Sequence, residues 1–325
     1  MSEALHVRVP GSTSNLGPGF DTLGLAVDRY LDLVWEAGER GTVIQEGERP
    51  PHPLGNLLAE GYAATGLPRA GRLRVRSEIP VGRGLGSSAA LLVGLRVLRE
   101  LIDAGCDGDL DPERLRNVID RRRLVAEVAA REGHPDNAAP SVYGGLVTAA
   151  DTDAGIRVVP LSLSVRIGWG WAAPSVAADT GRMRAALPDR VERSVAVRTV
   201  QRLAHLLPAL ATGDGEALAW AMADEIHVPA RLPLIPGAQE AVEAAHDAGA
   251  WSCTISGAGS GLIAAAPPER VESVVEAMHA AFRASDPEPE LATAFVVHPD
   301  LSGVRWGRGL TPPADHAVAP PTRRG

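Results

Sequence analysis

A glycine-rich loop that runs into an apolar helix has the clearest chemical meaning in this sequence. The segment reads IPVGRGLGSSAALL, and Gly82, Gly84 and Gly86 let the backbone turn tightly and approach a ligand without an obstructing Cβ atom. Ser87 or Ser88 is expected to cap the helix that follows. The first N–H groups of a helix have no internal partner and carry partial positive charge, which suits anions. The loop is therefore predicted to hold phosphate groups; a plain helix start after a turn is the alternative.

Two further polar segments could complete a site. In GHPDNAAPSVYGG, the residues His134, Asp136 and Asn137 fall within four positions of one another and lead into a strand. Such a cluster can bind a polar substrate and a metal ion, or it can form an Asx-type turn between a helix and a strand. The segment SGAGSG, Ser256 to Gly261, is a second glycine-rich turn able to approach a ligand, although alone it also indicates a hairpin or a bulge.

The composition excludes several kinds of chemistry. All 32 basic residues are arginines, so the chain has no phosphate-binding P-loop lysine, no Schiff-base nucleophile and no lysine general base. A net charge of −8 argues against a nucleic-acid-binding surface. Cys106 and Cys253 are too few for a disulfide scaffold or a cysteine-built zinc site. With no apolar signal segment and no apolar run of about 18 residues, we expect a cytoplasmic protein with no membrane partner.

Regular elements must position these motifs, and apolar periodicity predicts where they lie. A first strand is expected at 5–9, and residues 10–21 are expected to form a loop because Gly, Pro and Ser dominate them. Further strands are expected at 23–35, 73–77, 146–149, 157–161, 165–172, 251–255, 262–266 and 294–298. Helices are expected at 54–64, from 87 to about 105, from about 112 to 131, across 180–224, at 237–248 and from 268.

Strands and helices are interleaved in both halves of the chain. This pattern predicts two α/β or α+β lobes with a cleft between them. Asp151 to Gly155 form a turn signal, so we place the boundary there, giving an N-terminal lobe at 1–150 and a C-terminal lobe at 151–308. Residues 309–325 are rich in Pro, Arg and Gly and are predicted to be a disordered tail.

The motifs occur together and in order, and in that combination they resemble a known family. The segments PGSTSNLGPGFDTLGLAVD, IPVGRGLGSSAA, EGHPDNAAPSVYGG and ISGAGSG are similar to the successive motifs of homoserine kinases, within the GHMP small-molecule kinase superfamily. The first motif is specific to the homoserine kinase branch, whereas the glycine-rich one indicates only a GHMP kinase. The resemblance spans residues 5 to 300.

This resemblance implies an α+β, two-lobed GHMP kinase fold. The N-terminal, ATP-binding lobe would be like the second domain of ribosomal protein S5, and the C-terminal lobe would be ferredoxin-like. The implied activity is transfer of the ATP γ-phosphoryl group to the side-chain hydroxyl of L-homoserine, giving O-phospho-L-homoserine for threonine biosynthesis. Mg²⁺ is the implied metal, and a homodimer is the implied assembly.

Matched position by position, the resemblance also implies the site residues. ATP is expected at Asn56, Pro80, Gly82, Arg83, Gly84, Leu85, Gly86, Ser87 and Ser88. Mg²⁺ is expected at Ser87, Ser88 and Glu132, with Glu127 as the second acidic candidate; otherwise each glutamate is an exposed helix residue. The acceptor amino acid is expected at Asn15, Asp21, His134, Asn137, Thr180, Arg184, Arg231 and Gly257. Asp21 would pair with its ammonium group, and two arginines suit its carboxylate because a guanidinium can hold both oxygens; without the resemblance each would be a surface arginine.

Asn137, Asp136 and Arg184 are the expected catalytic residues. Phosphoryl transfer needs alignment and charge neutralisation more than covalent chemistry. Homoserine kinases are thought to pass the hydroxyl proton to the phosphate itself, so we expect Asn137 to orient the hydroxyl, with Asp136 as the general-base alternative.

The sequence departs from the family pattern in its opening motif, which reads GSTS rather than the commoner ATSA, and at three positions further along. Ser260 and Gly261 replace the usual Pro-(Ser/Thr) pair of the last motif, and Pro233 stands where a second basic residue is common. These departures leave two alternatives open: a GHMP kinase for another amino or hydroxy acid such as threonine, or a sensor that binds nucleotide and ligand without turnover.

Overall fold

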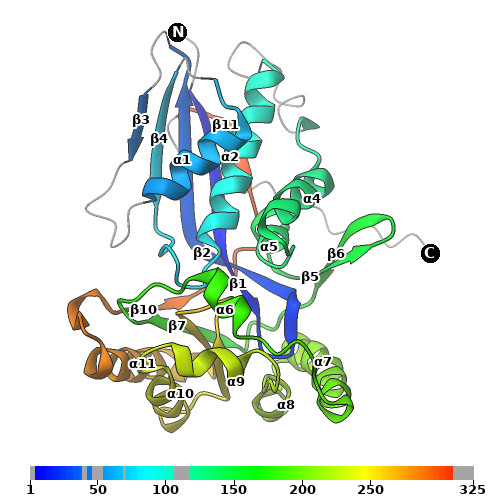
Figure 1. The fold of residues 1–325 in the computed structure, drawn as a ribbon, viewed down its shortest axis with the longest axis vertical. Helices are drawn as coiled ribbons and strands as arrows, with labels where there is room; N and C mark the ends of the chain where they lie inside the picture. Colours follow the sequence, from blue (N-terminus) through cyan, green and yellow to red (C-terminus); the bar gives the residue numbers. More distant parts are fainter. Residues whose placement is uncertain (1–3, 39–41, 46–53, 69–70, 106–116, 310–325) are drawn as a thin grey trace.

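The computed structural model describes residues 4–38, 42–45, 54–68, 71–105 and 117–309. Two sheets organise them (Figure 1). The larger, of seven strands among the described residues, has the order β11-β1-β2-β4-β3, and β5 joins β2 to β6. Its strands are β1 Leu5–Asn15, β2 Gly19–Glu36, β3 Thr42–Gln45, β4 Arg72–Ser77, β5 Leu146–Thr152, β6 Gly155–Leu161 and β11 Arg305–Arg308.

Helices cover one face of the larger sheet, as Figure 1 shows. They are α1 Gly55–Thr65, α2 Ser87–Asp103, α4 Arg121–Glu132 and α5 Ala138–Tyr143. Helix α2 lies at the centre of this layer because leucines, valines and alanines recur at helical spacing along it. Leu91, Leu95 and Leu98 are fully buried against the sheet. The predicted helix that follows the glycine-rich loop is thus confirmed.

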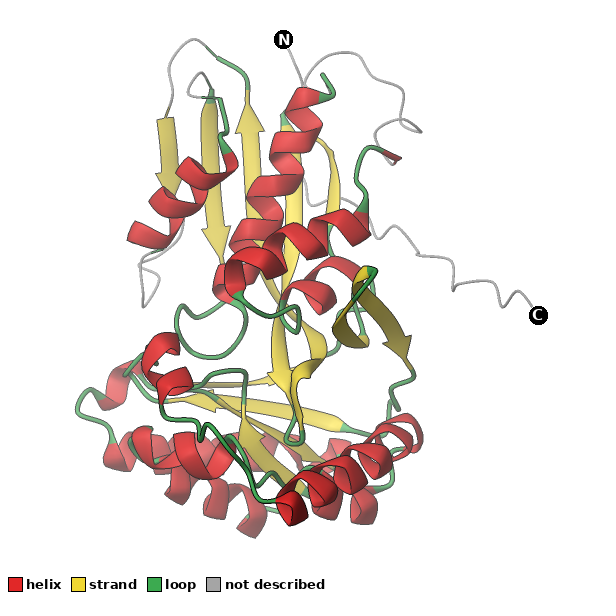
Figure 2. Cartoon of the chain, turned by 45° about the vertical axis from the view of Figure 1, so that its right-hand side comes forward, coloured by secondary structure: helices red, strands yellow, loops and turns green. Residues whose placement is uncertain are grey.

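The smaller sheet is antiparallel and has the order β10-β7-β9-β8. Its strands are β7 Gly168–Ala173, β8 Ser252–Ile255, β9 Leu262–Ala266 and β10 Thr293–Val297. Helices α10 Ala238–Asp247 and α11 Val271–Ser285 pack on the side away from the larger sheet (Figure 2). The remaining elements are α6 Thr180–Ala185, α7 Arg193–Thr212, α8 Gly215–Ala221, α9 Val228–Arg231 and the 3₁₀ turns η1 Leu232–Leu234, η2 Pro268–Arg270 and η3 Pro289–Leu291.

This architecture confirms the expected α+β fold with two lobes. The division of the chain at residue 150 stays a prediction. Strand pairing shows that β6 continues the larger sheet by pairing with β5 along its whole length. Strand β11, near the end of the described residues, pairs with β1 in the same sheet. No helix within the described ranges has the length and apolar character needed to cross a bilayer.

The loop predicted at residues 10–21 is confirmed only at 16–18, because β1 runs to Asn15 and β2 begins at Gly19. Strand β1 continues to Asn15 and pairs with β2, with register shifts after Pro10 and after Ser14. Small polar residues tolerate burial here because tertiary partners satisfy their hydroxyls. The Ser12 hydroxyl donates to Asn137, the Thr13 hydroxyl accepts from Ser256, and both serine and threonine are fully buried.

The helix expected from about residue 112 to 131 is interrupted: Asn117 is helical, residues 118–120 are not, and α4 begins at Arg121. Asp120 sets this start because its carboxylate accepts hydrogen bonds from the backbone N–H groups of Arg122 and Arg123. Pro112 and Cys106 lie outside the described residues, as do residues 310–325 of the predicted tail.

Candidate active site

A cavity of about 350 Å³ lies where the two lobes meet, and it gathers the motifs that the sequence analysis singled out. The sequence-predicted residues that line it are Asn15, Asp21, Gly82, Arg83, Gly84, Gly86, Ser87, Ser88, Glu132, His134, Asp136, Asn137, Thr180, Arg184, Arg231 and Gly257. Pro80, Leu85 and Glu127 are not among the lining residues. Asn56 is in the first turn of α1, and its side chain lies outside the described part of the chain; its neighbour Leu57 lines the cavity.

The glycine-rich loop is shaped by close contacts that exclude side chains. Gly84 and Gly86 have left-handed φ values of 78° and 66°. A Cβ atom at Gly84 would lie 2.0 Å from the carbonyl oxygen of Ser256, and one at Gly86 would lie 2.5 Å from the Ser12 hydroxyl. Glycine is required at both positions, because any other residue would be strained at these φ values and its Cβ atom would overlap with these neighbours. The loop is thereby pressed against both β1 and the turn at residue 256.

The predicted serine cap of α2 is wrong. Gly86 is the N-cap residue, and Ser87 and Ser88 already belong to the first helical turn, with no side chain capping it. The N–H groups of this turn therefore keep their partial positive charge toward the cavity. This arrangement suits a phosphate better than a serine-capped helix would, because a side-chain cap would occupy one of the donors.

The serines and Glu132 form a cluster of oxygen atoms beside the start of α2. The Ser88 hydroxyl donates to a Glu132 carboxylate oxygen at 2.7 Å. The Ser87 hydroxyl is buried and has no hydrogen-bond partner among the described residues. A buried hydroxyl without a partner and an adjacent carboxylate are the hard oxygen donors that Mg²⁺ prefers, so these residues fit the ion.

Glu127, the second acidic candidate, lies elsewhere. Its carboxylate makes ion pairs with Arg96 at 2.6 Å and with Arg123 at 3.4 Å, on the outer side of α2 and α4. The two glutamates are five residues apart on α4, which turns them about 140° away from each other around the helix axis. Glu132 is therefore the acidic residue that the fold brings to the cavity.

Arg83 turns its guanidinium away from the cavity. Its Nη2 donates to the carbonyl oxygen of Ser175 at 2.5 Å, and its Nη1 donates to that of Leu291 at 3.2 Å. The residue is fully buried, and burial lowers the pKa of its guanidinium. ATP binding by Arg83 stays a prediction; because its guanidinium makes these two hydrogen bonds, the backbone is the part of Arg83 left to contact a nucleotide.

Side chains of opposite charge line the end of the cavity away from the glycine-rich loop. Asp21 and Arg184 form a bidentate ion pair, with N–O distances of 3.0 and 3.1 Å. Arg231 is only 2% exposed, and its Nε donates to the carbonyl oxygen of Met183 at 3.1 Å. Burial, followed by the charge of Arg184, lowers the pKa of Arg231. This end of the cavity therefore holds groups of both signs: the two guanidinium groups, the Asp21 carboxylate and, next to it, Asp136.

Phe20 and His227 do not line the cavity, but they contact its arginines or each other, and the sequence analysis did not assign them. The Phe20 ring lies under the guanidinium groups of Arg231, at 5.1 Å, and Arg184, at 5.9 Å. The His227 ring also stacks with the Phe20 ring, with 5.1 Å between the centroids, and its Nε2 lies 2.9 Å from the Gly17 carbonyl oxygen. His227 belongs to the same HVPAR segment as Arg231, which is the one signal that could have indicated it.

Asn15 and Gly257 are joined by a hydrogen bond at the cavity, whereas Thr180 lies at its exposed edge. Asn15 is 2% exposed; its Nδ2 donates to the Gly257 carbonyl oxygen at 2.7 Å, and its Oδ1 accepts from the Asp21 N–H at 2.9 Å. Its amide therefore connects the β1–β2 turn to the glycine turn at 256–259. Thr180 is the exposed first residue of α6.

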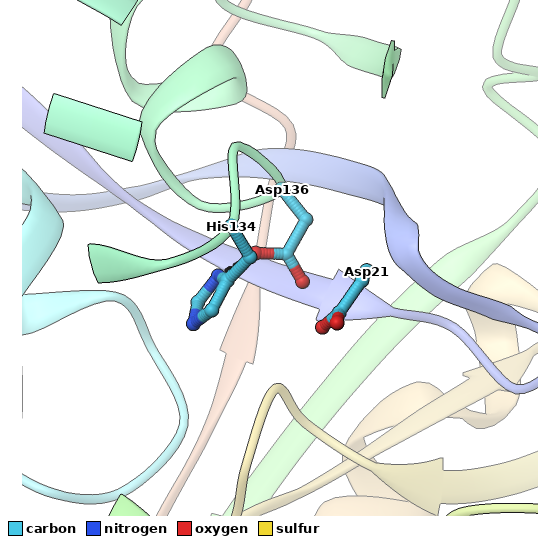
Figure 3. A group of neighbouring side chains, drawn as sticks. All are labelled: Asp21, His134 and Asp136. Atoms are coloured by element: carbon cyan, nitrogen blue, oxygen red, sulfur yellow. Dashed lines mark hydrogen bonds and ion pairs between the residues drawn. The ribbon is translucent and has the colours of Figure 1, made fainter. Parts of the chain in front are cut away.

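His134, Asp136 and Asp21 lie together, as Figure 3 shows, with ligand atoms within 4.8 Å of one another. The His134 Nδ1 lies 2.5 Å from a carboxylate oxygen of Asp136. Burial opposes charge on the imidazole, but the hydrogen bond and the negative charge of Asp136 prevail and raise the pKa of His134. Asn137 donates to the Ser14 hydroxyl at 3.0 Å and to Asp136 at 3.3 Å.

The raised pKa of His134 predicts a pH-dependent contribution to stability. Protonated His134 beside Asp136 stabilises the fold below the ordinary histidine pKa of about 6.5, and this contribution is lost as the pH rises through the higher folded-state pKa. We therefore expect the difference in Tm between the native protein and His134→Gln to shrink from mildly acidic to alkaline pH. Thermal unfolding of both proteins without ligand measures it, and a difference that is constant with pH would contradict it.

The departures at Ser260, Gly261 and Pro233 lie outside the cavity lining, whereas Ser14 of the GSTS opening is among the lining residues. The Ser260 hydroxyl donates to the Val176 carbonyl oxygen at 2.5 Å. A Cβ atom at Gly261 would lie 2.5 Å from the Arg83 carbonyl oxygen and 2.6 Å from the Trp171 indole nitrogen, so the residue must be glycine here. Pro233 lies in the turn η1. None of the three is among the residues that line the cavity.

Comparisons with known proteins agree with this geometry. Residues 56–145 match the model of the GHMP kinases N terminal domain, and residues 206–284 match that of the GHMP kinases C terminal domain. The homoserine kinase of Moorella thermoacetica is 39% identical over 266 residues, covering 79% of this chain and 86% of that protein. The homoserine kinase of Synechococcus sp. strain CC9902 is 36% identical over 320 residues, covering 94% and 96%.

The solved structures extend this similarity to three dimensions. The crystal structure of homoserine kinase from Cytophaga hutchinsonii superposes with a TM-score of 0.73 at 26% identity, covering 94% of this chain and 98% of that one. Leishmania major mevalonate kinase superposes with a TM-score of 0.61 at 14% identity, which shows the shared fold alone. With relatives above one-third identity over most of its length, the chain belongs to the homoserine kinase family of the GHMP kinases.

Proposed function

We propose that this protein transfers the γ-phosphoryl group of ATP to the side-chain hydroxyl of L-homoserine, giving O-phospho-L-homoserine. The observation that supports this most directly is the content of the single cavity described above. One end holds a glycine-rich loop and an uncapped helix N-terminus, and the other holds Asp21 beside Arg184 and Arg231. The cytoplasmic location and the homodimer stay predictions.

The loop end of the cavity suits a nucleotide triphosphate tail. Backbone N–H groups of the loop and of the first turn of α2 bind phosphate oxygens without any lysine, and they stabilise negative charge that spreads over the transferring group. Ser87, Ser88 and Glu132 are the residues that would hold Mg²⁺, which neutralises phosphate charge when bound. These residues also align the γ-phosphoryl group toward the middle of the cavity.

The charged end suits a zwitterion. The Asp21 carboxylate can pair with an ammonium group, and the guanidinium groups of Arg184 and Arg231 can hold a carboxylate through paired hydrogen bonds. The structure pairs Asp21 with Arg184 directly. A zwitterionic acceptor gives each of these charges a new partner, whereas a simple hydroxy acid or an uncharged sugar would leave Asp21 or the arginines without one. This chemistry favours an amino acid that carries a hydroxyl.

The surroundings of Asp136 favour orientation of the acceptor over strong general-base catalysis. Asp136 is 1% exposed, and the same carboxylate oxygen contacts both His134 and the Asn137 amide. A carboxylate that these contacts hold in place, at a residue that is almost fully buried, has little freedom to move toward the acceptor hydroxyl. We propose that Asn137 orients the hydroxyl and that the proton passes to the phosphate.

A panel of acceptors tests the proposed function. ADP release is measured with ATP, Mg²⁺ and, in turn, L-homoserine, L-threonine, a hydroxy acid without the amino group, and several sugars. We expect the highest kcat/KM with L-homoserine. Faster turnover of L-threonine or a sugar would reassign the acceptor, and ATP binding without turnover of any acceptor would identify a sensor.

Removal of the Asn137 amide is expected to affect turnover selectively. We expect Asn137→Ala to lower kcat for homoserine about tenfold, which corresponds to the loss of one orienting hydrogen bond, while the Kd for ATP stays near the native value. Initial-rate kinetics and calorimetric titration with ATP measure the two quantities. An unchanged kcat would remove Asn137 from the catalytic machinery.

A further inference from the structure

The glycine-rich loop is attached to a segment of the smaller lobe that leads to the acceptor end of the cavity. The Gly82 carbonyl oxygen accepts a hydrogen bond from the Ala178 N–H at 2.8 Å. A Cβ atom at Gly82 would lie 2.9 Å from the Ala177 Cβ, so these two segments of the chain are in close contact. Two residues after Ala178, α6 begins, and it carries Thr180 and Arg184 into the cavity.

Arg83 strengthens this attachment from inside the protein. Its guanidinium crosses from the loop to the smaller lobe, where it donates to the carbonyl oxygens of Ser175 and Leu291. Ser175 is held from its other side by Asp286, which accepts hydrogen bonds from both the N–H and the hydroxyl of that serine. A fully buried guanidinium costs free energy unless its donors are satisfied, so its position is specified by these partners.

Asp286 is itself held as a charged group. Burial disfavours its ionised form, but the hydrogen bonds from Ser175 and Glu288 and the charge of Arg83 outweigh this effect and lower the pKa of Asp286. The carboxylate and the guanidinium therefore fix Ser175 from opposite sides. The strand β7 ends at Ala173, so Ser175 is also the point at which the chain leaves the small sheet toward α6.

The same segment reaches Arg231. The Met183 carbonyl oxygen, in α6, accepts a hydrogen bond from the Arg231 Nε at 3.1 Å. Asp179 fixes the start of α6 by accepting from the Arg182 N–H at 2.7 Å. Continuous contacts thus run from the glycine-rich loop through Arg83 and Ser175 to α6, and from α6 to both arginines at the acceptor end.

We infer that Arg83 is a positioning residue that couples the nucleotide loop to the two acceptor-binding arginines through Ser175 and α6. A nucleotide that orders the loop then also orders α6, and by reciprocity the acceptor strengthens nucleotide binding. The inference rests on the proposed function in naming the ligands. It assigns to Arg83 a role that differs from direct contact with ATP.

Hydrogen exchange of α6 tests the coupling without the need for an acceptor. In the native protein, Mg²⁺ with a non-hydrolysable ATP analogue is expected to slow exchange of the 178–185 amides at least about fivefold. In Arg83→Lys, which keeps the positive charge but loses the forked donors, most of this protection should disappear. Asp286→Asn, which weakens the support of Ser175 and leaves Arg83 intact, should lose part of it.

Arg29 offers a matched control. It also crosses from the larger to the smaller lobe, donating to the Val296 carbonyl oxygen at 3.2 Å and lying 4.2 Å from the Phe295 ring centroid, but it does not touch the loop. Arg29→Lys should keep the native protection. Equal protection of α6 in Arg83→Lys, equal loss in Arg29→Lys, or no protection in the native protein would each overturn the coupling.

A second measurement separates this inference from the proposed function. In the native protein the ATP analogue should tighten binding of homoserine at least about fivefold, and this factor should fall toward one in Arg83→Lys. If the native protein phosphorylates no homoserine while the protection pattern holds, the acceptor assignment alone fails. If homoserine is phosphorylated while Arg83→Lys protects α6 like the native protein, the coupling alone fails.

Discussion

Replacement of Arg231 by methionine is expected to lower kcat/KM for homoserine at least about thirtyfold, while the KM for ATP stays close to the native value. The guanidinium is 2% exposed, lines the cavity and lies beside Arg184. The proposed partner of this guanidinium is the carboxylate of bound homoserine. Truncating one partner of a buried, hydrogen-bonded charge pair costs about 2–5 kcal/mol, because the other charge is left without compensation. Methionine has similar length and no charge, so the change removes the charge with little loss of volume.

Arg202 provides the control for this substitution. It is a half-buried arginine of the same lobe, with an ion pair to Glu225 at 3.0 Å and a contact with the Trp220 ring, but it lies outside the cavity lining. Arg202→Met should leave both KM values near native. Steady-state kinetics with each substrate varied in turn measure these effects, and normal use of homoserine by Arg231→Met would remove this residue from acceptor binding.

Local sequence patterns predicted many of the helices and strands and the glycine-rich loop at one end of the cavity. Gly84 and Gly86 could be recognised because left-handed backbone and close approach need glycine, and apolar residues at helical spacing specified α2. Such features depend on neighbours in the sequence. The same reasoning placed His134 to Asn137 at a helix-to-strand connection, where the structure has a turn and the short helix α5.

Features that depend on contacts between distant segments could not be predicted in this way. Composition indicated a loop at residues 10–21, yet residues 10–15 are part of β1, and hydroxyls of this segment are satisfied by Asn137 and Ser256, more than a hundred residues away. The contacts of Phe20 with His227 and with two arginines likewise arise only when β2 meets the segment that contains α9. The direction of the Arg83 side chain is a third case, because a glycine-rich loop motif does not specify which way its variable residue points.

The choice between Glu132 and Glu127 was open from the sequence because both precede the His134 motif on one helix. The fold separates them. Glu132 contacts Ser88 at the start of α2, and Glu127 contacts Arg96 and Arg123 on the outer side. The two side chains have the same chemistry and share a helix, so they form a matched pair for a test of the magnesium site.

We expect Glu132→Gln to lower kcat about a hundredfold or more and to raise the Mg²⁺ concentration needed for half-maximal activity. The amide keeps the size of the side chain and can still contact Ser88, but it lacks the negative charge that a hard divalent cation requires. Glu127→Gln should stay near native in both quantities, because it removes only exposed ion pairs worth about 1 kcal/mol or less. Initial rates over a range of Mg²⁺ concentrations at saturating ATP and homoserine give both numbers. If Glu127→Gln were the variant with the altered Mg²⁺ requirement, the oxygen cluster beside α2 would not be the metal site, and Ser87 would need another explanation for its unpartnered hydroxyl.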